Sequence, residues 1–152
     1  MTTGILVDPA AVVVRKLLTD EAVGTFPPVP PTTPDAWPIY AMHEPGEPGD
    51  CITVFEDGSG DDNGKTMQGE RVERQGIRIK VRCNTEVEGY AKAYEIAGLL
   101  DRVARREVAV NSRTYVVWSF KRATGPVQGG QETDSDRYSF VMSGTVGVRL
   151  RT

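Results

Sequence analysis

The architecture follows from one stretch, Gly76-Ile77-Arg78-Ile79-Lys80-Val81-Arg82-Cys83, in which apolar and basic side chains alternate. A period of two is typical of a β-strand with one face turned toward a core. We therefore expect a strand here whose isoleucine, valine and cysteine side chains are buried. The three cations should share the opposite face over roughly 13 Å, the rise of four strand residues.

Two helices should accompany this strand. Asp8-Pro9 is a typical helix start, because the Asp carboxylate can accept from free backbone N–H groups and Pro suits the first helical position. Apolar residues at helical spacing then predict a helix over 9–23. A second helix is predicted from Glu86 to Arg106, with acids near its start and arginines at its end. We expect it to cover the sheet through one stripe: Ala93, Ile96, Ala97, Leu100 and Val103.

Further strands are predicted on both sides of these elements. Residues 37–43 and 51–55 have strand composition and form either a hairpin or two separate edges. Residues 108–110 and 114–120 read as a hairpin around Asn111-Ser112. In that hairpin Val116, Trp118 and Phe120 should share a face. The last strand has one apolar phase: Tyr138, Phe140, Met142, Val146, Val148 and Leu150.

Three segments are expected to connect these elements. The Pro-rich segment 27–34 is a stiff connector or an arm, the acidic, glycine-rich segment 56–70 is a mobile loop, and 125–136 is a second polar loop. The sequence therefore predicts a single α+β domain over 1–152. Its mixed or antiparallel sheet is packed by two helices and carries long polar loops.

Composition excludes several functional classes. The 18 basic and 21 acidic side chains give a net charge of -3, so no global positive field draws the protein to nucleic acid or to a membrane. The longest apolar run, residues 10–14, is far too short to span a bilayer. Cys51 and Cys83 lie in strand patterns and read as buried, reduced thiols of a cytosolic product.

The sequence contains partial motifs for phosphate binding, calcium binding and histidine chemistry, but each lacks the required spacing or the required partner residues. Gly60-Asp61-Asp62-Asn63-Gly64-Lys65-Thr66 lacks the first glycine of a phosphate-binding loop, and its two acids would repel phosphate. The same acids lack the glycine and the terminal Glu of a calcium loop. His43 is the only histidine, so no histidine-based triad or zinc site can form within one chain. We predict a protein that is not an enzyme, with no catalytic, cofactor-binding or metal-binding residues and no cofactor.

The basic face of the strand 76–83 is the feature of the sequence that indicates a binding function. Arg149 and Arg151 could join Arg78, Lys80 and Arg82 if the last strand is a neighbour in the sheet. Such a face could contact nucleic acid, although no aromatic residue alternates with the cations to stack on bases. It could equally face acids of a loop or of another subunit, or remain solvated. These five residues are the candidates for contact with nucleic acid or with another subunit.

Taken in order, the elements resemble the tail terminator or tail completion family of long-tailed bacteriophages, also labelled minor capsid or neck proteins. The likeness rests on an opening helix, an early Pro-rich segment and four motifs: Gly76–Arg82, Tyr90–Asp101, Val116–Ser119 and Asp136–Val141. The resemblance implies a virion subunit assembled in the host cytoplasm into a ring of six copies. That ring would cap the tail tube, stop its polymerisation and offer the head a surface to join.

The resemblance also implies the partners of such a ring. They are further copies of the chain, the tail tube protein and the head-completion or connector protein, with transient, sequence-independent passage of DNA and no membrane. Two alternatives stay open at this point: a head-completion or connector protein on the portal side, and a nucleic-acid-binding module that uses the basic strand face.

Overall fold

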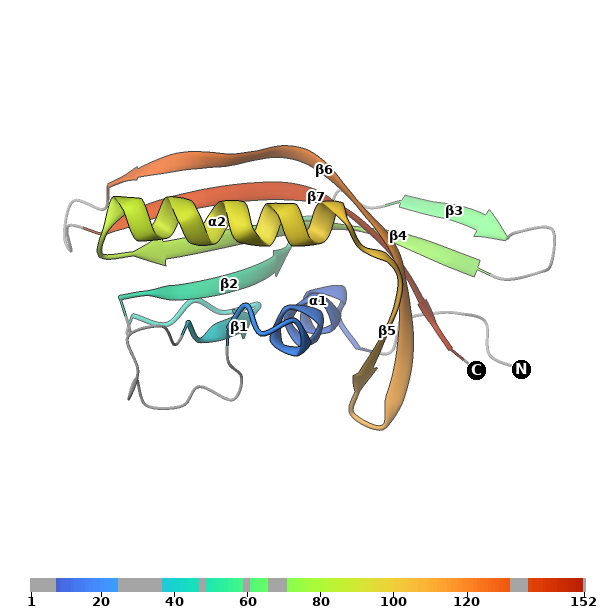
Figure 1. Ribbon diagram of the computed structural model, residues 1–152. Coiled ribbons are helices and arrows are strands. Elements are labelled where there is room, and N and C mark those ends of the chain that lie inside the picture. The colour runs from blue at the N-terminus through green and yellow to red at the C-terminus, as the bar shows by residue number, and fades with distance from the viewer. Residues whose placement is uncertain are drawn as a thin grey trace.

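The computed structural model describes residues 8–24, 37–46, 49–58, 61–65, 71–131 and 137–151. Within these residues the chain forms two helices and a seven-stranded sheet (Figure 1). In chain order the elements are α1 (Ala10–Asp20), β1 (Ile39–Ala41), β2 (Cys51–Glu56), β3 (Asp61–Lys65), β4 (Arg71–Cys83), α2 (Glu86–Asp101), β5 (Ala104–Val110), β6 (Arg113–Gln131) and β7 (Tyr138–Leu150). The predicted α+β class is confirmed.

The sheet has the strand order β1-β2-β4-β7-β6-β5, and β3 pairs with β4 outside that path. Every pair is antiparallel except β1 with β2, in which Ile39 lies opposite Ile52 and Ala41 opposite Val54 in parallel. The parallel pairing excludes the hairpin that we considered for these two segments. β1 is an edge strand, and β2 lies inside the sheet next to β4.

The alternation in β4 is confirmed. Ile77, Ile79 and Val81 have no solvent exposure, and they pack in one cluster with both helices. That cluster includes Leu17 of α1 and Leu100 of α2. Both helices therefore pack on the same face of the sheet, and α2 runs along the strands in front of β4 and β7 (Figure 1).

Both predicted helices are longer than the observed ones. The predicted second helix ran to Arg106, but α2 ends at Asp101 and the chain enters β5 at Ala104. Pairing of Ala104 with Ser119 and of Arg106 with Val117 supplies these residues with strand hydrogen bonds, which outweigh their helical propensity. The predicted first helix, 9–23, is confirmed over Ala10–Asp20.

Two predicted loops contain strands. Residues 61–65 of the acidic segment form β3 on β4, and the predicted loop over 125–136 is strand as far as Gln131, because β6 continues along β7. Their composition did not favour strands, but long neighbouring strands offer both segments backbone hydrogen-bond partners. The Pro-rich segment 27–34 and residues 132–136 lie outside the described residues.

The hairpin of β5 and β6 is confirmed, with one change of phase. Asn111 and Ser112 have φ values of 47° and 69°, as a two-residue hairpin turn requires. A register shift between Val117 and Ser119 moves Trp118 out of step with β7. Phe120 consequently joins the helix-covered core, whereas the prediction placed it on one face with Val116 and Trp118.

Candidate functional site

The candidate site is the sheet face that the helices leave open, and we call it the open face. On it Arg78 lies between Phe55 of β2 and Ser143 of β7. The next row holds Thr53, Lys80, Val141 and Val127, and the row after that holds Cys51, Arg82 and Ser139. The three cations of β4 therefore share one face, as the strand period predicts.

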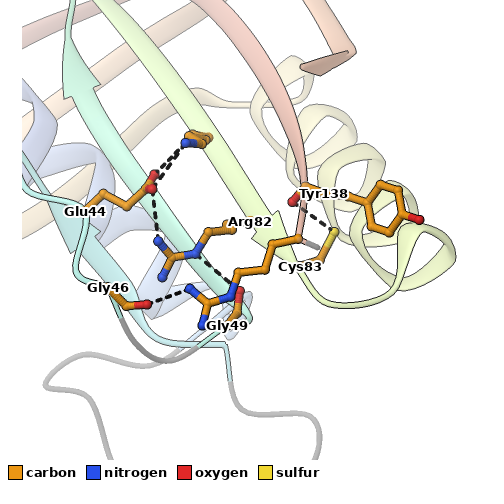
Figure 2. Close-up of polar contacts among 8 residues, drawn as sticks. Glu44, Gly46, Gly49, Arg82, Cys83 and Tyr138 are labelled. Carbon is orange, nitrogen blue, oxygen red and sulfur yellow. Dashed lines mark hydrogen bonds and ion pairs between the residues drawn. The ribbon is translucent and has the colours of Figure 1, made fainter. Parts of the chain in front are cut away.

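Glu44 binds two of these cations. One of its carboxylate oxygens accepts from Lys80 Nζ at 3.2 Å and from Arg82 Nη1 at 3.0 Å, and the other lies 3.1 Å from Lys80 Nζ (Figure 2). The Arg82 side chain is only 4% exposed, so its charge needs this carboxylate. Arg82 Nε also donates to the carbonyl of Gly49 at 3.4 Å.

Two more contacts hold the connection between β1 and β2 in place. Arg137 donates to the carbonyl of Gly46 at 2.6 Å, and Asp50 accepts from the backbone N–H of Asn84 at 2.8 Å. Together with Glu44, these contacts fasten the described part of residues 42–50 to the ends of β4 and β7. Glu44, an acid of the same chain, thus neutralises charge at Lys80 and Arg82, which is one of our alternatives for the basic face.

Arg78 is arranged differently. Its side chain is exposed, and the guanidinium carbon lies 5.0 Å from the centre of the Phe55 ring. This cation–π contact leaves the N–H groups at the rim of the guanidinium available to an acceptor. No ion pair of Arg78 occurs within the described part of the chain, so Arg78 is the cation of this row that is best placed to meet another molecule.

Arg149 and Arg151 do not join the row. β7 is a neighbour of β4, but Arg149 lies six residues beyond Ser143, about 20 Å along the strand. The guanidinium of Arg149 stacks on Trp118 at 5.5 Å, and Arg151 forms an ion pair of 2.7 Å with Glu107. The five candidate residues therefore form two groups at opposite ends of the open face.

The second group contains two residues that the sequence analysis missed. Trp118 lies in the register shift of β6, and Arg105 stacks on it at 5.3 Å, so two guanidinium groups contact one indole ring. Arg105 has a φ of 49°, a left-handed conformation that is unusual for an arginine. The predicted helix concealed this contact, because it placed Arg105 in a helical turn.

Both cysteines are buried, reduced thiols. Burial raises the pKa of Cys83 to about 11 and also raises the pKa of Cys51, so neither is a thiolate at neutral pH.

The described residues contain no group of three side chains able to hold a metal ion. His43 is exposed. Neither described helix has the length and apolar character needed to cross a membrane.

The fold and this site define a small α+β protein with one open sheet face. Charged side chains lie on that face, and some of them bind the backbone of the connection between β1 and β2. A family model described as bacteriophage tail terminator protein matches residues 16–146. The chain therefore belongs to the bacteriophage tail terminator protein family, and it is a structural component of a phage tail.

A solved structure is also similar to the chain. It is titled "Virion of native gene transfer agent (GTA) particle", and one of its chains is 14% identical to this one with a TM-score of 0.43. The alignment covers 73% of this chain and 78% of that chain. No curated protein gives a significant match.

Proposed function

We propose that this protein forms a closed ring of six copies at the head-proximal end of a phage tail. The ring ends polymerisation of the tail tube and offers the surface to which the head-completion or connector protein binds. Chain 1–152 acts as one non-enzymatic domain that assembles in the host cytoplasm, with segments 27–34 and 56–70 as arms. Family membership over residues 16–146 carries this proposal.

The subunit architecture supports it. Both helices pack on one sheet face, so the subunit has two unlike faces, one helical and one an open sheet with basic residues. Unlike faces on identical copies favour head-to-tail contacts, which close into a ring when the rotation between neighbours allows it. A ring with unlike ends can bind the tube on one side and reject further tube protein on the other.

The basic residues of the open face have a role in the proposed ring. Arg78, Lys80 and Arg82 lie near the lumen or at a subunit seam, and Arg149 and Arg151 lie at a second point of the same surface. If they line the lumen, they give passing DNA a weak, salt-sensitive and sequence-independent contact. Tight binding is not expected, since an exit channel must release its DNA.

Two measurements test the ring and its position. Light scattering after size-exclusion chromatography should give a mass several times 16.6 kDa for the purified protein. Particles made without the protein should then carry tails of uncontrolled length. Normal tails that fail to attach to heads would instead assign the chain to the connector, and a monomer both in solution and in particles would refute the ring.

A further inference from the structure

α2 carries one stripe of apolar side chains that are exposed to solvent. Val87, Tyr90 and Tyr94 are spaced three and four residues apart, so they form one stripe. Their exposed fractions are 76%, 53% and 45%. In Figure 1 no other described helix or strand lies in front of α2. We call these three residues the α2 stripe.

Ring contacts hold the tyrosines of the α2 stripe in place, and two glutamates lie in the first turn of the same helix. The Tyr90 and Tyr94 rings lie 4.5 Å apart, and Tyr90 also contacts Phe140 edge-on at 6.0 Å. Glu86 and Glu88 are exposed in the first turn of the same helix. Neither forms an ion pair with any residue that the structure describes. Exposed apolar side chains that lie together beside charged residues mark a surface that contacts another molecule.

The open face offers a surface of matching size and opposite charge. Phe55, Arg78 and Val127 lie on it in adjacent cross-strand rows, and Val127 is 57% exposed. We call these three residues the sheet patch. From β2 to β6 it spans three strand spacings, about 14 Å. The α2 stripe spans about 10 Å along its helix, and Arg78 supplies the cation that Glu86 and Glu88 lack.

The alternative of adding a strand to the sheet is disfavoured. β5 pairs only with the first part of β6, so the rest of that strand forms an exposed edge within the described chain. That part contains Pro126, which has no N–H group, and three register shifts with β7. Proline and bulges are the usual protection of an edge against strand addition, so the faces are left for contact between copies.

We infer that the α2 stripe of one copy packs on the sheet patch of the next copy, with Arg78 bound by Glu86 or Glu88 of its neighbour. This contact rests on the proposed ring and identifies its seam. The two surfaces lie on opposite layers of the subunit, so each copy can use both at once. The contact is heterologous, which is the kind that closes a ring.

Cross-linking tests the contact directly, with Val87→Cys and Val127→Cys as the two variants. Both positions are exposed, and the native cysteines are buried. When the variants are mixed and oxidised, in solution and in purified particles, a disulfide should link residue 87 of one copy to residue 127 of another. Each variant alone should give no linked dimer. A dimer formed by Val87→Cys alone would mean a helix-to-helix contact and would overturn the inference.

Charge reversal gives a second, independent readout. Arg78→Glu and the pair Glu86→Arg with Glu88→Arg should each raise the concentration at which the ring dissociates by roughly tenfold or more, because like charges then meet at the seam. Combining all three changes in one chain should return it to near the wild-type value. The control is Asp20→Arg, an exposed acid of α1, which should leave the ring unchanged.

The outcomes separate this inference from the proposed function. A ring that forms without the mixed disulfide, or that survives both reversals, would refute the seam and leave the ring standing. A wild-type chain that is monomeric both in solution and in particles would refute the ring, and the seam with it.

Discussion

Gly89 of α2 packs so closely on Cys83 of β4 that a methyl group at residue 89 would overlap the thiol sulfur. Gly89 is therefore fixed by packing, although glycine is unfavourable inside a helix. This contact brings the start of α2 against the end of β4, and it sets the height at which the helix crosses the sheet.

Gly89→Ala should destabilise the protein. Overpacking a filled site costs about 1–3 kcal/mol, and the gain in helix propensity of about 1 kcal/mol offsets only part of it. Gly98→Ala is the matched control, because the nearest side-chain atom that a methyl group there would meet, on Arg102, is 4.0 Å away. Urea unfolding should show Gly98→Ala to be as stable as the wild type or more stable. Equal stabilisation by both changes would contradict the close contact.

Glu44→Ala should cost about 1.5–3 kcal/mol, the value of hydrogen bonds to charged groups, because it leaves the buried Arg82 without its carboxylate. Asp20→Ala removes an exposed pair with Lys16 and should cost less than about 1 kcal/mol. Chemical unfolding of both variants measures the difference. If the two losses were alike, the Glu44 contact would be no more than a surface pair.

Leu100→Ala should cost about 2–5 kcal/mol, because Leu100 is 1% exposed and belongs to the cluster between α2 and the sheet. The half-buried Leu99 on the same helix is the control, and its truncation should cost clearly less. Thermal unfolding followed by circular dichroism gives both values. An unchanged midpoint for Leu100→Ala would remove α2 from the core.

Stability should fall as the pH rises above about 9. The pKa of Cys83 is about 11 in the folded protein, above its ordinary value of 9.0, so the folded state holds this proton more tightly than the unfolded state does. The stabilisation is complete below pH 9 and declines by about 1.4 kcal/mol per pH unit between 9 and 11. Cys83→Ala should flatten this decline in urea titrations. An identical slope in the variant would show that Cys83 does not contribute.

Local pattern was sufficient where a segment had one face in the core. The alternation through β4 and β7 and the spacing in α2 predicted these elements correctly. The burial of Ile79 or Leu100 depends on its position in the strand or helix period, which the sequence itself contains. The pattern failed where a neighbour decides the structure. β3 and the second half of β6 are strands because β4 and β7 extend alongside them, and no composition rule contains that information.

The three cations of β4 were predictable from the sequence, and their partners were not. The period of two was enough to place Arg78, Lys80 and Arg82 on one face. It could not show that Glu44 would meet two of them, since that contact depends on how β1 pairs with β2. The Trp118 stack was hidden for a similar reason, because one extra residue in β6 changes which side chains share a face.

The parallel pairing of β1 and β2 has a consequence for how this surface can vary. Two parallel neighbours cannot be joined by a tight turn, so the chain after β1, described at 42–46 and 49–50, returns along the sheet before β2 begins. That return path carries Glu44 over Lys80 and Arg82. The length of this connection therefore sets whether Glu44 can reach Lys80 and Arg82, and it can vary without any change in the pairing of β2 with β4.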